Sequence, residues 1–183
     1  MLVKPTFSVL YNESFPSALE TALEELKRLV GGFDLTSEVY HFPHLERYYG
    51  KEMGYPLKRL YLSGKNLINA DPCSQGLNPL KLKLLAMEIE KELSVGGNRV
   101  VNIDPGWVDK HHLFLTTHKE RGGRFYLGKG IFAEMEYLYF GGDFRDLFWT
   151  YEDYRKREVK DFFLKVRRLY LKQLKEAERA KNS

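Results

Sequence analysis

Two short motifs in the second half of the chain place polar side chains beside turn residues within apolar segments. One is Asn102-Ile103-Asp104-Pro105-Gly106-Trp107, and the other is Leu127-Gly128-Lys129-Gly130-Ile131-Phe132-Ala133-Glu134. Carboxylates, an amide and a glycine-flanked lysine are groups that bind anions and transfer protons. We expect both motifs to meet around one solvent-reachable hollow, which would be the functional end of the molecule.

The first motif predicts an amide and a carboxylate side by side near the end of a strand. Alternate residues of a strand share a face, so Asn102 and Asp104 should lie side by side, with Val101 and Ile103 turned towards the helices. Pro105-Gly106 should then turn the chain and end the strand. Asp104 is therefore an acid–base candidate. The alternative is that it only accepts backbone N–H bonds at the turn.

The second motif has two interpretations. Glycines on both sides of Lys129 let the backbone approach a ligand, whose phosphate or carboxylate the lysine would bind. Alternatively, Gly128 and Gly130 make a bulge or bend in a long strand and Lys129 faces solvent. The spacing matches neither a P-loop nor a dinucleotide fingerprint.

Glu134 is the second catalytic candidate. An acidic residue among apolar neighbours needs a partner if it is buried, and Lys129, Arg124 or Lys119 can supply one in an ordinary cross-strand ion pair. Two carboxylates near a phosphate can also hold Mg²⁺, whereas no histidine or cysteine spacing predicts a protein-built metal site. The candidate ligand-binding residues are Glu52, Arg59, Asn102, Trp107, Arg124, Gly128, Lys129 and Gly130.

The predicted elements give an α+β fold. Strands are expected at residues 7–11, 38–42, 57–63, 99–104, 113–117, 124–127 and 131–139, with a connection at 44–56. Helices should begin at Ser17, with Glu20 completing a capping box, at Asn78-Pro79, and at Glu152. This order is that of a ferredoxin-like core (βαββαβ), an antiparallel sheet with helices on one face, extended by a hairpin and a long C-terminal helix.

The length and composition indicate one domain, residues 1–183, without a membrane span. The 183 residues are 43% hydrophobic, which suffices for a core, and no apolar run approaches the roughly 20 residues of a span. The single Cys73 fits a reducing compartment, so we expect a cytoplasmic protein. Charged residues at 30% with few glutamines lean towards a thermophilic source.

Positive charge is concentrated in the C-terminal helix, residues 152–183, whose last turns should fray. Residues 155–181 hold 11 Lys and Arg against 4 Asp and Glu, so the rest of the chain is net acidic. A basic helix face is usually solvated, but it can also bind nucleic acid. A homodimer built through this helix is compatible with every function considered.

The two motifs together resemble the domain-of-unknown-function 4416 family of bacteria and archaea, and the likeness covers nearly the whole chain. Glu52-Met53-Gly54, Lys58-Arg59 and Trp149-Thr150-Tyr151 with Asp153-Tyr154 also look like parts of its pattern. The resemblance implies a small single-domain protein without an established activity. Some relatives carry a GTP-binding label, which no guanine-specifying motif supports here. Trp107 stands where the family has a tyrosine, and Gly122-Gly123 precedes Arg124 where a histidine is expected, which leaves His118 as a substitute.

The leading hypothesis is a domain that binds a phosphorylated or nucleotide-like small anion, with hydrolysis or transfer of that ligand as the reaction considered. Lys129, Arg124 and Arg59 would hold the anion and Asn102 would orient it. The alternative is a non-catalytic adaptor or nucleic-acid-binding protein that uses the basic C-terminal helix, with binding that falls steeply with salt.

Overall fold

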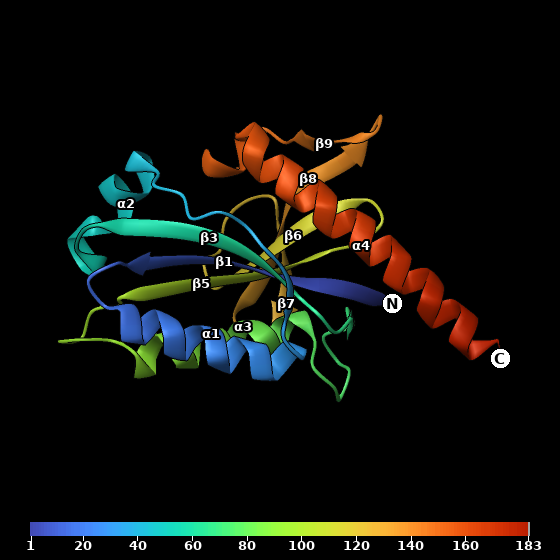
Figure 1. Ribbon diagram of the computed structural model, residues 1–183, viewed down its shortest axis with the longest axis horizontal. Helices are drawn as coiled ribbons and strands as arrows, with labels where there is room; N and C mark the ends of the chain where they lie inside the picture. The colour runs from blue at the N-terminus through green and yellow to red at the C-terminus, as the bar shows by residue number, and fades with distance from the viewer. Residues whose placement is uncertain (183) are drawn as a thin grey trace.

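The computed structural model describes residues 1–182, which form one antiparallel sheet with helices on both faces (Figure 1). The strands are β1 (Leu2–Asn12), β2 (Phe33–Thr36), β3 (Leu57–Gly64), β4 (Ile68–Asn69), β5 (Val101–Val108), β6 (His112–Thr117), β7 (Arg124–Gly128), β8 (Ile131–Phe140) and β9 (Asp143–Asp146). The helices are α1 (Pro16–Val30), α2 (Pro43–Met53), α3 (Pro79–Glu92), the short 3₁₀ turn η1 (Asp153–Arg155) and α4 (Arg157–Lys181). The predicted α+β class, antiparallel sheet and long C-terminal helix are confirmed, and the ferredoxin-like core stays a prediction.

The strand order is β2-β3-β1-β5-β6-β8-β7, with β4 paired to β1 and β9 to β8. Helices α1 and α3 cover one face, where Ala22, Leu26 and Ala86 pack against Phe7 and Ile103. Helix α4 runs across the other face (Figure 1), and its aromatic side chains enter a second core cluster with residues of β3 and β8. Among residues 1–182, no helix combines the length and apolar character that a bilayer crossing needs.

Several local predictions are wrong for identifiable reasons. The strand expected at 38–42 is absent, because the chain pairs with β3 earlier, at β2, and α2 begins at Pro43. The connection expected at 44–56 is therefore largely helix α2. Helix α1 begins at Pro16, and Phe15 caps it without a side-chain hydrogen bond, so the Ser17–Glu20 capping box does not form. The cap at Asn78 is confirmed, since its side chain accepts the N–H of Lys81 at 3.0 Å.

Strand β5 does not end at Pro105-Gly106 but continues to Val108. A proline is tolerated here because its nitrogen points away from β1, towards a side where β5 has not yet met another strand. Gly106 marks the point of contact with β6: a Cβ there would lie 2.1 Å from the carbonyl oxygen of Phe114. From Gly106 the two strands pair for three residues, up to Val108 opposite Leu113.

A buried lysine ties the C-terminal helix to the sheet. Lys4 is fully buried, and its ammonium donates to Asp34 Oδ2 at 2.6 Å, the Gly64 carbonyl at 2.9 Å and Gln173 Oε1 at 2.8 Å. These bonds join β1, the edge strand β2, the end of β3 next to it, and α4. They offset the high desolvation cost of the charge.

We expect Lys4→Met to lower the free energy of unfolding by roughly 3 kcal/mol, because the change leaves Asp34 and two other acceptors without their donor. Urea denaturation measures the loss. Lys27→Met is the matched control, since Lys27 pairs with Glu24 on an exposed helix surface and should cost less than about 1 kcal/mol. Equal stability of the two variants would contradict the role given to Lys4.

Candidate functional site

A large cleft lies where β5 and β6 separate. It has a volume of about 1080 Å³ and is lined by residues of α2, β3, α3, β5, β6, β7 and β8, by residues 118–121, and by residues 151–154. Because β5 and β6 pair only from Gly106 to Val108, the preceding half of β5 and the following half of β6 diverge and leave a space between them. The cleft therefore results from the way the sheet is built.

We call the region where β5 and β6 diverge the fork. Side chains form hydrogen bonds with the backbone groups that the fork leaves without a partner strand. Glu90 Oε1 accepts the N–H of Ile103 at 2.9 Å, and Lys83 donates to the Ile103 carbonyl at 3.3 Å. On the other side, the Thr116 hydroxyl donates to the Pro105 carbonyl at 2.7 Å. Lys83 and Glu90 are seven residues apart on the buried face of α3, so charged side chains take the place of a neighbouring strand.

Asn102 and Asp104 face this cleft side by side, as alternation predicts. Asn102 Nδ2 donates to Asp104 Oδ2 at 2.9 Å, and Arg99 Nη1 donates to Asn102 Oδ1 at 2.6 Å. The second bond fixes which end of the amide meets the carboxylate. Asp104 is oriented but not enclosed, because 28% of its side chain remains exposed.

Arg99 connects three elements at one end of the cleft. Its Nε donates to Glu52 Oε2 at 2.8 Å and its Nη1 to Glu90 Oε2 at 3.2 Å. Glu52, predicted to contact ligand, thus helps position Arg99 from the last turn of α2. Burial raises the pKa of Glu90, against the opposing influence of Lys83, the Ile103 N–H and Arg99.

Arg59 is buried in the cleft wall without a hydrogen-bond acceptor. Only 4% of the residue is exposed, yet neither Nε nor Nη1 makes a hydrogen bond within residues 1–182. Its nearest anionic atoms are Asp153 Oδ2, 3.7 Å from Nε, and Asp104 Oδ2, 3.8 Å from Nη1. Both distances exceed those of a hydrogen bond. A buried guanidinium in this state has donor capacity that an acceptor in the cleft can use.

Asp153 is buried beside Arg59 and is held by other groups. The Tyr61 hydroxyl donates to its Oδ2 at 2.5 Å, and His44 Nε2 lies 3.7 Å from its Oδ1. Burial alone would raise the pKa of Asp153, but His44, Arg59 and Tyr61 outweigh burial and keep that pKa below its usual value. Asp153 is therefore an ionised wall residue that balances Arg59.

Glu134 is locked in the interior. Only 3% of its side chain is exposed, and it binds Arg121 Nη2 at 2.7 Å as well as Arg124. Of the partners considered for it, the structure provides Arg124 and adds Arg121. Of the two predicted catalytic carboxylates, Asp104 thus keeps an oxygen available to a ligand, while Glu134 orders the loop that carries both arginines.

Of the second motif, Glu134 lines this cleft but the Gly128-Lys129-Gly130 segment does not, so the expectation that Lys129 shares the hollow with Asn102 and Asp104 is wrong. Gly128, Lys129 and Gly130 form the tight turn between β7 and β8, all with positive φ, and Lys129 is exposed there. The glycines belong to a hairpin turn, and the pairing of β7 with β8 also shifts register between Tyr126 and Gly128, so the alternative of a bulge or bend with Lys129 facing solvent describes this segment. Trp107 is buried instead, stacked on Phe114 at 4.8 Å between ring centroids.

The charged residues around the cleft are balanced. The basic ones are Arg59, Lys83, Lys91, Arg99, Lys119, Arg121 and Arg124. The acidic ones are Glu52, Glu90, Asp104, Glu120, Glu134, Glu152 and Asp153. Seven positive and seven negative formal charges cancel, so the lining has no excess charge to attract a distant ion. Residues 1–182 contain no group of three or more His, Cys, Asp or Glu side chains arranged to hold a metal ion, and the Mg²⁺ hypothesis gains no support.

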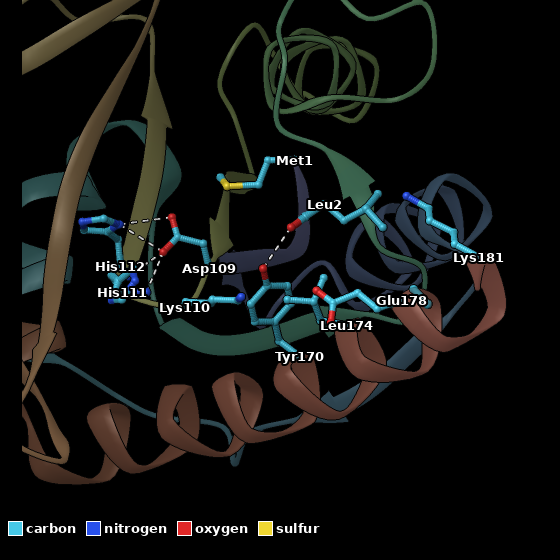
Figure 2. A pocket seen from close by; sticks show the side chains of 11 residues that line it. Met1, Leu2, Asp109, Lys110, His111, His112, Tyr170, Leu174, Glu178 and Lys181 are labelled. Atoms are coloured by element: carbon cyan, nitrogen blue, oxygen red, sulfur yellow. Dashed lines mark hydrogen bonds and ion pairs between the residues drawn. The ribbon is translucent and has the colours of Figure 1, made fainter. Parts of the chain in front are cut away.

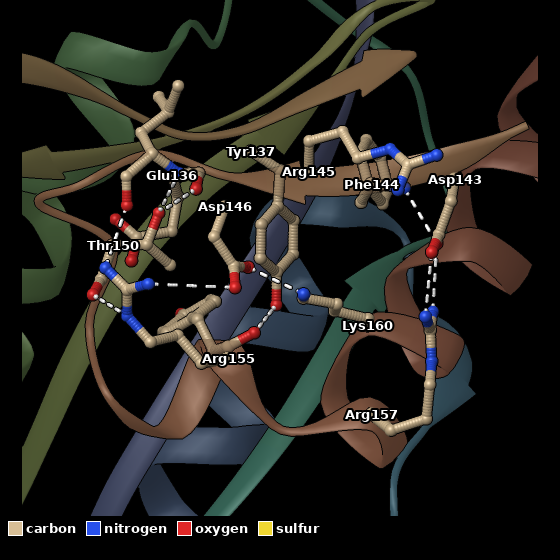
Figure 3. Close-up of polar contacts among 12 residues, drawn as sticks. Glu136, Tyr137, Asp143, Phe144, Arg145, Asp146, Thr150, Arg155, Arg157 and Lys160 are labelled. Carbon is tan, nitrogen blue, oxygen red and sulfur yellow. Dashed lines mark hydrogen bonds and ion pairs between the residues drawn. The ribbon is translucent and has the colours of Figure 1, made fainter. Parts of the chain in front are cut away.

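Polar contacts at the β8–β9 hairpin hold the wall formed by residues 151–154 (Figure 3). The Thr150 hydroxyl donates to the Glu136 carbonyl at 2.7 Å, and Glu136 Oε1 accepts the Tyr151 N–H at 2.6 Å. Lys160 binds Asp146 at 2.8 Å and Arg157 binds Asp143 at 2.8 Å. These pairs fix the start of α4 and occupy part of the positive charge that a nucleic acid would need.

A second, smaller hollow of about 480 Å³ lies between the N-terminus, the β5–β6 turn and the last part of α4 (Figure 2). Asp109 accepts the backbone N–H of His111 at 2.7 Å and lies 3.0 Å from His112 Nδ1, while the Tyr170 hydroxyl donates to the Leu2 carbonyl at 3.0 Å. These polar groups bind one another. The hollow is therefore a weaker candidate than the fork.

Glu136 gives the cleft wall a testable pH dependence. Burial raises the pKa of this fully buried carboxyl well above its usual value, and its Oε2 has no partner within residues 1–182. Between the pKa of an unfolded glutamate and the higher folded value, the native state keeps a proton that the unfolded chain releases. Stability therefore falls as pH rises through this window.

Because glutamine does not ionise, Glu136→Gln should remove this contribution, which amounts to at most about 1.4 kcal/mol per pH unit. Urea unfolding from about pH 5 to pH 9 provides the measurement. The exposed Glu88→Gln serves as control and should keep the wild-type slope. An identical slope in Glu136→Gln would show that Glu136 is not the titrating group.

Comparisons with known proteins agree with the motifs. No curated protein and no solved structure matches the chain. A family model described as a domain of unknown function (DUF4416) matches residues 1–170, which include β1 to β9 and most of α4. The chain therefore belongs to the domain-of-unknown-function 4416 family.

Proposed function

We propose that the cleft binds a small ligand bearing an oxyanion, such as a phosphorylated metabolite, with Arg59 as its anchor. The observation that carries this proposal is a guanidinium that is 4% exposed, lines the cleft and has no hydrogen-bond acceptor from residues 1–182 at its Nε and Nη1. A phosphate or carboxylate oxygen meets this need with a short, charge-assisted hydrogen bond.

Further donors surround the same space. Lys83 Nζ lies 3.5 Å from Asp104 and bonds the Ile103 carbonyl weakly, so it can turn towards a ligand. Tyr49 also lines the cleft, and burial, together with the charge of Asp104, raises the pKa of its hydroxyl, which stays protonated and can donate. The volume of about 1080 Å³ leaves room for a ligand much larger than inorganic phosphate.

Binding of nucleic acid through α4 has less support. Arg155, Arg157 and Lys160 are engaged by Asp143 and Asp146. The cleft lining is formally neutral, which favours local hydrogen bonding over long-range attraction.

Arg59→Gln should weaken binding of a phosphorylated ligand about a hundredfold or more, since two or more charge-assisted hydrogen bonds are lost. A thermal-shift screen of sugar phosphates and nucleoside monophosphates identifies the ligand, and titration calorimetry measures its affinity. Lys83→Gln, in the same cleft, should weaken binding less, and it tests the proposal if Arg59→Gln does not fold. Lys129→Ala, on the exposed β7–β8 turn, is the control and should bind like wild type. A folded Arg59→Gln variant with unchanged affinity would refute the proposal.

The affinity should change little between about 50 and 200 mM salt, because the charges of the cleft lining cancel. Binding of nucleic acid through six or more phosphates would instead weaken at least about a thousandfold over this range. Calorimetry of the identified ligand and filter binding of a duplex oligonucleotide, repeated at both salt concentrations, separate the two functions.

A further inference from the structure

We infer that the ligand is zwitterionic, with an amine that binds Asp104 a short distance from the oxyanion that binds Arg59. This inference rests on the proposed function and specifies its ligand class. The Arg59 guanidinium is a donor without an acceptor at its Nε and Nη1. The inference starts from a second incompletely bonded group in the cleft, the Asp104 carboxylate, which is an acceptor.

One carboxylate oxygen of Asp104 accepts a hydrogen bond and the other does not. Oδ2 accepts the Asn102 amide at 2.9 Å, whereas Oδ1 accepts no hydrogen bond from residues 1–182. The closest cation, Lys83 Nζ, is 3.5 Å from Oδ1. A carboxylate has about four acceptor positions, so Asp104 retains capacity on the side that faces the cleft. Because Arg99 fixes the amide of Asn102, the carboxylate is held ready rather than free to rotate.

The charge balance of the lining points the same way. A simple anion placed at Arg59 would give the neutral cleft a net negative charge, close to Asp104 and Asp153. An ammonium group on the same ligand offsets one of these negative charges and pairs with the carboxylate that has an open oxygen.

The geometry limits the spacing of the two ligand groups. Arg59 Nη1 and Asp104 Oδ2 are 3.8 Å apart. The guanidinium and the carboxylate are therefore neighbours in the cleft wall, and the amine and the oxyanion should be joined by a short linker. Aminated phosphates such as 2-aminoethyl phosphate and glucosamine 6-phosphate meet this requirement.

Matched ligands that differ only in the amine test the inference. Calorimetry on the full chain compares 2-aminoethyl phosphate with ethyl phosphate, and glucosamine 6-phosphate with glucose 6-phosphate. We expect the aminated member of at least one pair to bind about tenfold tighter or better. Equal affinities within both pairs would overturn the zwitterionic ligand while leaving the proposed oxyanion site intact. Failure of all four to bind would count against the proposed function and this inference together.

Asp104→Asn should change the affinities for the two kinds of ligand in opposite directions. The amide can still accept the Asn102 hydrogen bond but has lost the negative charge, so it should weaken the aminated ligand and tighten its amine-free partner. Glu152→Gln is the control: Glu152 lines the cleft with 62% of its side chain exposed, and the preference for the amine should persist. An amine preference that survives Asp104→Asn would exclude Asp104 as the receptor. The comparison of ligands on the wild-type chain decides the question if Asp104→Asn fails to fold.

Discussion

The structure depends on a short contact between two strands. Strands β5 and β6 pair from Gly106 to Val108 and then diverge, and the absence of a side chain at Gly106 permits their close approach. Backbone groups beyond the contact must find partners elsewhere, because unpaired buried N–H and C=O groups are costly. Glu90, Lys83 and Thr116 provide those partners. Charged side chains therefore enter the protein interior for a structural reason, and the cleft they line follows from it.

Buried charge then becomes the main property of the cleft. Each ion there is balanced by another: Arg99 by Glu52 and Glu90, and Glu134 by Arg121 and Arg124. Arg59 and Asp104 differ, because their distances to the nearest groups of opposite charge, 3.8 Å to each other, 3.7 Å from Arg59 to Asp153 and 3.5 Å from Asp104 to Lys83, are longer than those of a charge-assisted hydrogen bond. Two incompletely paired groups of opposite charge, within a network that is otherwise satisfied, are a specific feature with a chemical meaning.

The sequence predicts what depends on local periodicity. Alternation along β5 correctly places Asn102 and Asp104 together, and the Asn78 cap follows from residue type alone. Contacts between distant segments were not predictable, since Arg59 meets Asp153 only when η1 folds against β3. Lys83 and Glu90 do leave a signal, as charges seven residues apart on a buried helix face. The turn at Lys129 was misassigned to the site, because a glycine-flanked lysine suits a hairpin as well as a ligand loop.

The fork also bears on solubility. The first half of β5 is an edge that, left open, would offer hydrogen-bonding groups to a strand of another molecule. Pro105 removes one donor from this edge, while the side chains of Lys83 and Glu90 occupy both backbone groups of Ile103. The residues that shape the cleft thus prevent intermolecular strand addition there. Exchange of Lys83 or Glu90 for a small apolar residue would expose the protein to aggregation even if it still folded.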